Sequence, residues 1–340
     1  MNEPPAHLPL LELAFSTLLL RALHTVAERG VADVLAGDGP LTSAEIAERV
    51  GVRPAGLHQV LRSLAGIGVF TSDGEGRFRL TPMGETLRSD HPSAMRELLL
   101  TMAGPGIWPA LSRFSDAVAT GRTGMELAHG VPFFDYLQDH PDEGAAFNRM
   151  MLAVHGAEPP AVAEAYDFSG LGRLVDVGGG IGTMLVNVLG RHPALSGVLF
   201  DMPSVLDQAR ATIAAAGLTE RCEFAAGDFM KSVPAGGDAY LLSHIIHDWD
   251  EASCLTILGN CREAMGPDGR LLIVEMVLPP GDEPHPGKVL DLAMLALVGG
   301  QERTADEYGE LLAKAGFRLE RVVPTTTPVS IVEALPARTS

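Results

Sequence analysis

The fold of this 340-residue chain is decided by the stretch Leu174-Val175-Asp176-Val177-Gly178-Gly179-Gly180-Ile181-Gly182. An apolar run of strand length leads directly into glycines, and a helix-forming stretch follows. Glycine has no Cβ, so the backbone of such a turn can approach a ligand closely at the carboxyl edge of a sheet. The stretch therefore predicts a ligand-binding loop, with Asp176, Gly178 and Gly180 as candidate cofactor-binding residues.

Outward from this loop, strands alternate with stretches of helix length. The candidate strands are residues 173–177, 197–201, 223–226, 239–243 and 270–276. Such alternation is typical of an open parallel sheet covered by helices. We therefore expect an α/β, Rossmann-like domain over residues 166–340.

The acidic residues after the next two strands indicate the ligand. Thr183 breaks the GxGxxG dinucleotide pattern, and the loop has no lysine for a pyrophosphate. Asp201 lies 201 − 178 = 23 residues after the first glycine, where a carboxylate can accept hydrogen bonds from ribose hydroxyls. Asp228 and Phe229 suit an adenine amino group and ring. A nucleoside without phosphates fits this set, and S-adenosylmethionine is such a ligand, with S-adenosylhomocysteine as product.

A possible catalytic group follows the fourth strand. His247 and Asp248 lie just beyond residue 243, close to the edge where open α/β sheets bind ligands. A neutral imidazole can take a proton from a hydroxyl while that oxygen attacks an activated methyl group. Glu275 ends an apolar strand, and Glu302 follows two glycines, so both are candidate partners of the imidazole. The alternative for Glu302 is a surface ion pair with Arg303.

The N-terminal 100 residues predict a helix, turn, helix and β-hairpin, as in a winged helix. Thr42-Ser43-Ala44-Glu45 is a capping box, and Asp73-Gly74-Glu75-Gly76 separates two short strands. This region has nine Arg and twelve Asp or Glu, a net charge of 9 − 12 = −3, which disfavours DNA binding. We interpret residues 1–100 as a dimerisation domain, with a DNA-binding regulator as the alternative.

Residues 101–165 read as a helical linker with apolar and aromatic faces, among them Trp108 and Met151. Such residues are more often plain core than ligand-binding, but here they directly precede the glycine loop. We expect this linker to contribute to a substrate pocket.

The cysteine pattern and the N-terminal composition favour a protein of a reducing, intracellular compartment. The net charge is −18, the three cysteines show no paired spacing, and the N-terminus lacks a basic signal-peptide region. No apolar run near 18 residues is apparent, because the best candidate, residues 289–298, contains Asp291. We expect a cytoplasmic protein that binds neither nucleic acid nor membrane.

Taken together, these motifs resemble those of the S-adenosylmethionine-dependent O-methyltransferases of the plant caffeic acid and isoflavone type and their bacterial polyketide-, phenazine- and mitomycin-tailoring relatives. The resemblance covers nearly the whole chain. It includes the winged helix, the linker and the runs VDVGGGIG, FDMP, GDFM, HDWD, VEMVLP and GGQERT.

The resemblance implies a class I methyltransferase domain, a homodimer and no metal. It implies that His247 is the general base and that Glu275 and Glu302 flank it. Cofactor-binding positions would be Gly178, Asp201, Asp228 and Phe229, with Ser243 where many plant members have a lysine. Met151 and Met294 would sandwich an aromatic acceptor, and Trp108 would line the same cavity.

The expected function is methylation of a phenolic or enolic hydroxyl of an aromatic or polyketide-like small molecule in secondary metabolism, such as antibiotic biosynthesis. Two alternatives remain at this point. One is a non-methylating S-adenosylmethionine enzyme, such as a decarboxylase, hydroxylase or pericyclase. The other is a winged-helix regulator that senses a small molecule.

Overall fold

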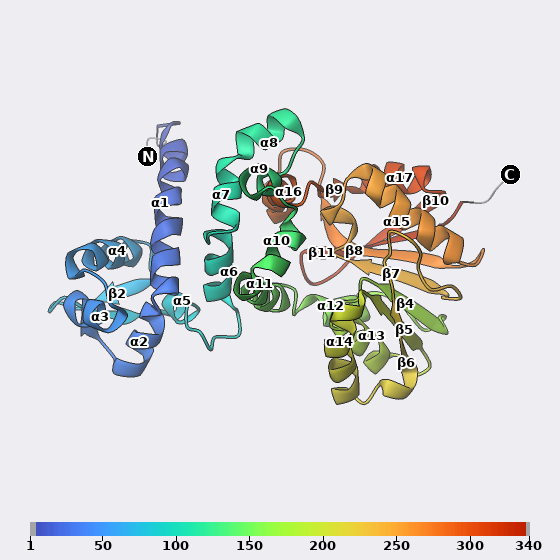
Figure 1. Cartoon of the computed structure of the whole chain (residues 1–340), viewed down its shortest axis with the longest axis horizontal. Coiled ribbons are helices and arrows are strands. Elements are labelled where there is room, and N and C mark those ends of the chain that lie inside the picture. Colours follow the sequence, from blue (N-terminus) through green and yellow to red (C-terminus); the bar gives the residue numbers. More distant parts are fainter. Residues whose placement is uncertain (1–4, 338–340) are drawn as a thin grey trace. The chain divides into compact units, whose positions relative to one another are not determined.

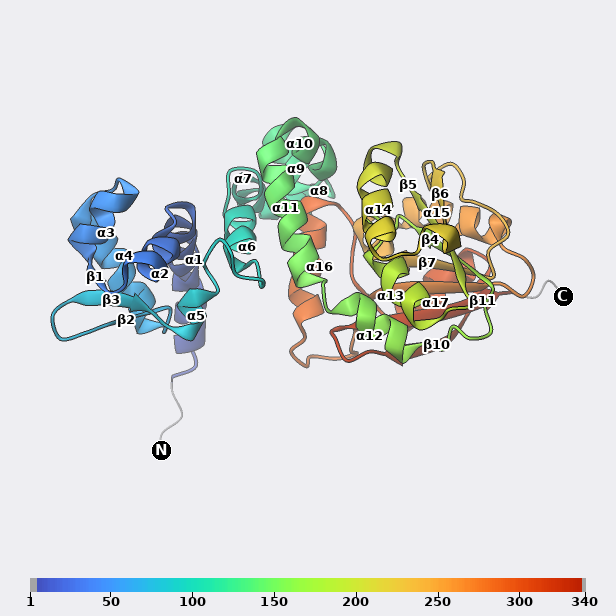
Figure 2. The same ribbon diagram turned by 90° about the horizontal axis from the view of Figure 1, so that it is seen from below.

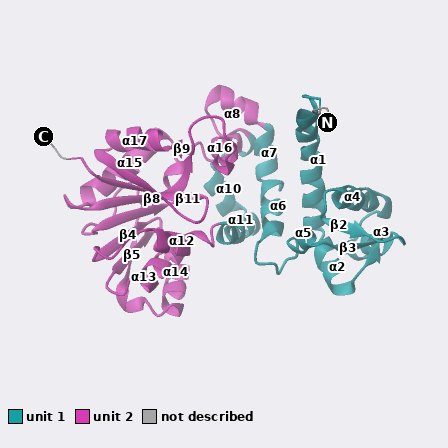
Figure 3. Cartoon of the chain, turned by 180° about the vertical axis from the view of Figure 1, so that it is seen from behind, with its two compact units in different colours: residues 1–112, 128–154 teal, residues 113–127, 155–340 magenta. Residues whose placement is uncertain are grey.

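A computed structural model describes residues 5–337 of the chain. Two compact units make up the chain (Figure 3). Unit 1 comprises residues 1–112 and 128–154, and unit 2 comprises residues 113–127 and 155–340.

Unit 1 begins with the winged helix that the sequence predicts (Figure 1). The Thr42 side chain and Glu45 form a complete capping box at the start of α3. A short strand, β1, joins the predicted hairpin in a sheet of order β1-β3-β2 and was not predicted, because it has only two residues. The elements are α1 (Leu8–Glu28), α2 (Val31–Asp38), β1 (Leu41–Thr42), α3 (Ser43–Val50), α4 (Pro54–Gly66), β2 (Phe70–Ser72), β3 (Arg77–Leu80) and α5 (Pro82–Glu85).

The linker is helical, as expected. Helix α6 (Met95–Met102) ends just inside the linker's N-terminal bound at residue 101. The linker then contains α7 (Ile107–Ser112), α8 (Phe114–Thr120), α9 (Gly124–His129), α10 (Phe133–Asp139), α11 (Pro141–Val154) and α12 (Glu158–Ala165). Helices α6 and α11 pack together within unit 1, whereas α8 and α12 belong to unit 2.

Helix α1 corrects one expectation about apolar runs. By length and composition it could cross a membrane, with a mean hydropathy of 1.4, although core helices and signal sequences meet the same criterion. Glu12 and Arg21 interrupt the apolar residues, which is why no uninterrupted run was apparent in the sequence.

Unit 2 is built on a mixed sheet (Figure 2). All five predicted strands form, and they pair in parallel in the order β8-β7-β4-β5-β6. An antiparallel pair, β10 and β11, extends the sheet beyond β8 and was not predicted. The strands are β4 (Arg173–Val177), β5 (Ser196–Asp201), β6 (Cys222–Ala226), β7 (Ala239–Ser243), β8 (Arg270–Leu278), β9 (Arg303–Thr304), β10 (Phe317–Pro324) and β11 (Val329–Pro336).

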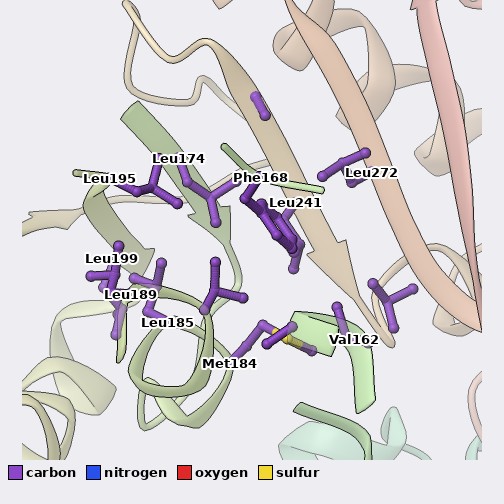
Figure 4. Packing of buried hydrophobic residues seen from close by; sticks show 14 of the residues in the cluster. Val162, Phe168, Leu174, Met184, Leu185, Leu189, Leu195, Leu199, Leu241 and Leu272 are labelled. Carbon is purple, nitrogen blue, oxygen red and sulfur yellow. The ribbon is translucent and has the colours of Figure 1, made fainter. Parts of the chain in front are cut away.

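Helices cover both faces of this sheet and bury two separate apolar clusters. One cluster includes Leu174, Leu185 and Leu241 and lies under α12, α13 (Thr183–Arg191) and α14 (Pro203–Ala215) (Figure 4). The other lies under α15 (Glu251–Ala264) and α17 (Ala305–Lys314). Helix α16 (Pro286–Leu297) and the single 3₁₀ turns η1 (Thr219–Arg221) and η2 (Ile246–Asp248) complete the unit.

The order of the strands fixes where a ligand binds. Strand β4 lies between β5 and β7, so the direction of chain progression reverses there. In open α/β sheets, ligands bind at the carboxyl ends of the strands flanking such a switch point. The glycine loop follows β4, and the histidine-containing turn η2 follows β7, so both reach this edge.

Candidate active site

The glycine loop has the backbone that a closely approached ligand requires. Gly178, Gly180 and Gly182 have φ values of 71°, 56° and 87°, a region that favours glycine. A Cβ on Gly178 would lie 2.6 Å from Ile245 Cδ1, whereas a Cβ on Gly180 would meet open space. The loop is therefore held against the residues after β7 on one side and open on the other.

Asp176 lies beneath this loop, and its environment fits a bound cation. Its side chain is buried, and Oδ2 has no hydrogen-bond partner. Burial, together with the charge of Asp201, raises the pKa of Asp176 to about 7. A positively charged ligand above the loop would favour the ionised form of this carboxyl, as S-adenosylmethionine would.

Asp201 also faces the glycine loop. Its Oδ2 accepts a hydrogen bond from the Gly180 backbone N–H at 2.8 Å, and its Oδ1 accepts one from the Met202 N–H at 2.6 Å. Each carboxylate oxygen can accept a second hydrogen bond, so both stay available to ribose hydroxyls. Asp201 therefore links the loop to the end of β5, as the expected ribose position requires.

Three further candidate cofactor residues lie on the same part of unit 2. Phe229 packs edge-on against Trp249, with ring centroids 5.9 Å apart, and its ring would be 3.6 Å from a Cβ on Gly178. Asp228 accepts a hydrogen bond from the Met230 N–H at 2.9 Å. Ser243 is the last residue of β7 and is half-buried. Phe229 thus lies next to the glycine loop, and Asp228 and Ser243 lie at or just after the carboxyl ends of β6 and β7.

His247 forms a buried pair with Glu302. The His247 Nδ1 lies 2.7 Å from Glu302 Oε1, and both side chains are buried. Glu302 is itself held by its backbone N–H, which donates to Asp291 at 2.8 Å. The bond leaves His247 Nε2 pointing away from Glu302, with Asp248 Oδ1 3.6 Å away. Arg303 donates to the carbonyl oxygens of Ile246 and Gln301. The alternative considered from the sequence, a surface ion pair between Glu302 and Arg303, therefore does not form.

The surrounding charges strongly affect the pKa of His247. Burial by itself would lower this pKa, but the hydrogen bond to Glu302 and the charges of Glu275 and Asp248 raise it to about 9. Burial raises the pKa of Asp248 to about 6, and burial also raises the pKa of Glu302. The imidazole is thus a strong proton acceptor among buried carboxyl groups.

Glu275 contacts His247 differently from Glu302. Its Oε1 accepts the backbone N–H of His247 at 3.1 Å, and its Oε2 accepts the hydroxyl of Tyr308. Of the two glutamates, only Glu302 bonds to the ring. Tyr308 was missed by sequence reasoning, because an ordinary buried position in an amphipathic helix gives no chemical signal.

A second group of polar side chains, centred on the buried Glu158, lies beside His247, with the His244 and His247 ring centroids 5.2 Å apart. Glu158 at the start of α12 is 3.0 Å from His155 Nδ1 and 2.6 Å from His244 Nε2. Burial would raise the pKa of Glu158, but these bonds lower it to about 2. Within residues 5–337, this trio is the group of possible metal ligands whose ligand atoms lie within 4.8 Å of one another. Glu158 forms a hydrogen bond with each histidine, and His244 Nδ1 is buried without a hydrogen-bond partner.

The proposed acceptor-binding residues are distributed over both units. Trp108 and Met151 belong to unit 1, and Met294 belongs to α16 of unit 2. All three are half-buried, and the Arg21 guanidinium lies 5.1 Å from the Trp108 ring centroid. Their common role in a pocket remains a prediction.

A class I S-adenosylmethionine-dependent methyltransferase is the class of protein that this sheet order, glycine loop and acidic cofactor edge define. Comparison with known proteins identifies the family. Residues 111–318 match the O-methyltransferase domain, and residues 11–90 match the O-methyltransferase dimerisation domain. The chain belongs to this O-methyltransferase family and is an S-adenosylmethionine-dependent O-methyltransferase.

Three relatives illustrate the similarity. The phenazine O-methyltransferase PhzM of Lysobacter antibioticus is 43% identical, over 96% of this chain and 95% of its own length. The mitomycin biosynthesis 6-O-methyltransferase of Streptomyces lavendulae is 38% identical, over 92% and 90%. The structure of NcsB1 from neocarzinostatin biosynthesis, in complex with S-adenosylmethionine and 2-hydroxy-5-methyl naphthoic acid, has a TM-score of 0.82. It is 35% identical and covers 93% of this chain and 95% of its own.

Proposed function

We propose that this enzyme is a cytoplasmic homodimer that methylates a phenolic or enolic hydroxyl of an aromatic small molecule, with His247 as general base. The observation that carries the proposal is the 2.7 Å bond between His247 Nδ1 and Glu302, at the edge of the sheet that also holds the glycine loop. The bond fixes the ring and leaves Nε2 as the proton acceptor. Relatives that act on phenazines and naphthoates support an aromatic acceptor.

This proposal assigns a role to the candidate cofactor-binding and catalytic residues of unit 2. Asp201 would hold the ribose, Asp228 and Phe229 would hold the adenine, and Asp176 and Ser243 would be near the charged tail. When bound, the cofactor would supply an electrophilic methyl group on a sulfonium sulfur. The acceptor oxygen would bond to the methyl carbon as the sulfur–methyl bond breaks, so that S-adenosylhomocysteine leaves. His247 Nε2 would take the acceptor's hydroxyl proton, and Glu302 would stabilise the imidazolium that forms. Trp108, Met151 and Met294 would hold the acceptor ring, and no step requires a metal.

Cofactor binding tests the assignment of the loop. In titration calorimetry, S-adenosylhomocysteine should bind the wild-type enzyme, and Asp201→Ala should weaken binding by about 10- to 100-fold, since each charge-assisted hydrogen bond contributes about 1.5–3 kcal/mol. Asp250→Ala is the matched control, because Asp250 also accepts a backbone N–H, that of Ser253, but lies at the start of α15. Equal affinities of Asp201→Ala and Asp250→Ala would show that Asp201 does not bind the ribose.

Product analysis then separates methyl transfer from other uses of the cofactor. A screen of hydroxylated aromatics, starting with 1,4-dihydroxy-2-naphthoic acid, should yield a product heavier by one CH₂ together with S-adenosylhomocysteine. The NcsB1 structure with that naphthoic acid motivates the first compound.

The exposed apolar residues of α1 support dimerisation. Leu10, Leu11, Leu13, Phe15 and Leu18 are all about half to two-thirds exposed, and the last four lie in the segment that matches the dimerisation domain. Such a patch is typical of an interface. We expect a sedimentation mass near twice the 35.9 kDa of one chain. A mass of one chain at micromolar concentration would contradict the dimer.

A further inference from the structure

The peptide group that joins Ile246 to His247 is held by hydrogen bonds on both sides. Its carbonyl oxygen accepts a hydrogen bond from Arg303 Nη1 at 3.4 Å and one from Cys254 Sγ at 3.2 Å. Its N–H donates to Glu275 Oε1 at 3.1 Å. All five residues are buried. A single peptide group thus contacts side chains from α15, β8 and β9, three elements distant in sequence.

Two more contacts connect these side chains to one another. Tyr308 on α17 donates its hydroxyl proton to Glu275 Oε2, and Arg303 Nη2 lies 3.7 Å from Cys254 Sγ. Burial raises the pKa of the Cys254 thiol to about 11 and that of the Tyr308 phenol well above its usual range. Both groups therefore keep their protons and remain donors at neutral pH. Neither has a hydrogen bond to the His247 ring.

We propose that Tyr308, Cys254, Arg303 and Glu275 form a peptide clamp that sets the direction of the His247 imidazole. The clamp residues are positioning residues, because they act through the backbone and not on the reacting atoms. This inference rests on the proposed role of His247 as general base. It changes the expected role of Glu275, which holds the base by its backbone, while Glu302 holds it by its ring.

The local backbone explains why a clamp is needed. His247 lies in a single 3₁₀ turn of three residues, which is too short to stabilise itself. His244, two residues before the first residue of this turn, has a φ of 54°, which is uncommon for a residue other than glycine. A short turn so close to a residue in this conformation keeps one conformation only when its surroundings impose it. Methyl transfer needs the base within hydrogen-bonding distance of the acceptor hydroxyl, so small rotations of the turn are costly.

Removal of the Tyr308 hydroxyl is the direct test. Tyr308→Phe keeps the ring in the core but leaves Glu275 Oε2 without its donor. We expect kcat to fall about 10- to 100-fold, with KM for both substrates unchanged within about twofold. Hydrogen exchange, which needs no acceptor, should be about tenfold faster at the His247 amide, read by mass spectrometry on the peptide that contains it.

Tyr240→Phe is the matched control. Tyr240 is also fully buried, but its hydroxyl shares its hydrogen between the carbonyl oxygens of Pro234 and Ala264 and accepts the Gly237 N–H, away from η2. Each variant loses the hydrogen bonds of one buried phenol hydroxyl, so a general loss of stability would affect both. We expect Tyr240→Phe to keep wild-type kcat and wild-type exchange at His247.

Cys254 offers a rescue experiment. Cys254→Ala removes one of the two donors to the Ile246 carbonyl, and we expect a roughly 3- to 10-fold loss of kcat. Cys254→Ser restores a donor at the same place and should recover most of the lost kcat.

Equal kcat and equal hydrogen exchange at His247 in Tyr308→Phe and Tyr240→Phe would overturn the proposed clamp. Full activity of His247→Ala would instead contradict the assignment of His247 as general base, independently of the result for Tyr308→Phe.

Discussion

His247→Ala should lower kcat by about 10²- to 10⁴-fold, the usual contribution of a positioned general base. The affinity for S-adenosylhomocysteine should stay within about twofold of wild type, because the Asp201 and glycine-loop contacts do not involve the imidazole. Single-turnover methyl transfer and calorimetry on the same protein measure the two effects separately. A variant that methylates at the wild-type rate would exclude His247 as the base.

The pH dependence gives an independent check. A base must be unprotonated to accept a proton, so activity should rise with pH as His247 loses its proton. Because the pKa of His247 in the free enzyme is raised to about 9, kcat/KM should increase up to that pH. In His247→Ala this rise should be absent.

Glu302→Gln should move the same rise toward lower pH, since the hydrogen bond and charge of Glu302 are among the causes that raise the pKa of His247. Its loss of kcat should be smaller than that of His247→Ala, because the imidazole remains. The reverse order of the two losses would mean that the base and its partner are assigned incorrectly.

Gly300→Ala should have the second large effect, a loss of kcat of about 100-fold or more. A Cβ at this position would lie 1.9 Å from the carbonyl oxygen of His247 and 2.6 Å from the carbonyl carbon of Asp248. Both are backbone atoms, so the loop that carries Glu302 has to move away from the turn that carries His247. A displacement of about 1 Å is enough for such a loss.

Gly259→Ala is the control for this substitution. Gly259 lies within α15, and nothing is within 4 Å of the position of its Cβ. Alanine is the better helix former, so this variant should be at least as stable as wild type and fully active.

For Gly300→Ala, overpacking should also lower the free energy of unfolding by about 1–3 kcal/mol. Thermal unfolding and kcat, measured on both variants, test this; wild-type kcat in Gly300→Ala would contradict the close contact.

Local sequence patterns were sufficient to predict many helices and strands and the position of the glycine loop. The capping box at Thr42 and Glu45 started the predicted helix, because such a motif satisfies backbone groups within four residues. The five parallel strands followed from apolar runs of strand length, and the glycine loop indicated the cofactor edge. The antiparallel strands β10 and β11 were missed, since exposed positions interrupt the apolar pattern of β10.

Tertiary structure alone decided which groups of the site form hydrogen bonds with one another. His247 and Glu302 are 55 positions apart, and their side chains meet at 2.7 Å where the loop that contains Gly300 packs closely against the turn after β7. The sequence indicated two glutamates near the base, but not which one bonds the ring and which one bonds the backbone. That choice depends on the placement of β8 beside β7 and on Tyr308, which occupies one oxygen of Glu275. Hydrogen bonds between distant segments depend on the directions of side chains, and residue types along the chain do not encode those directions locally.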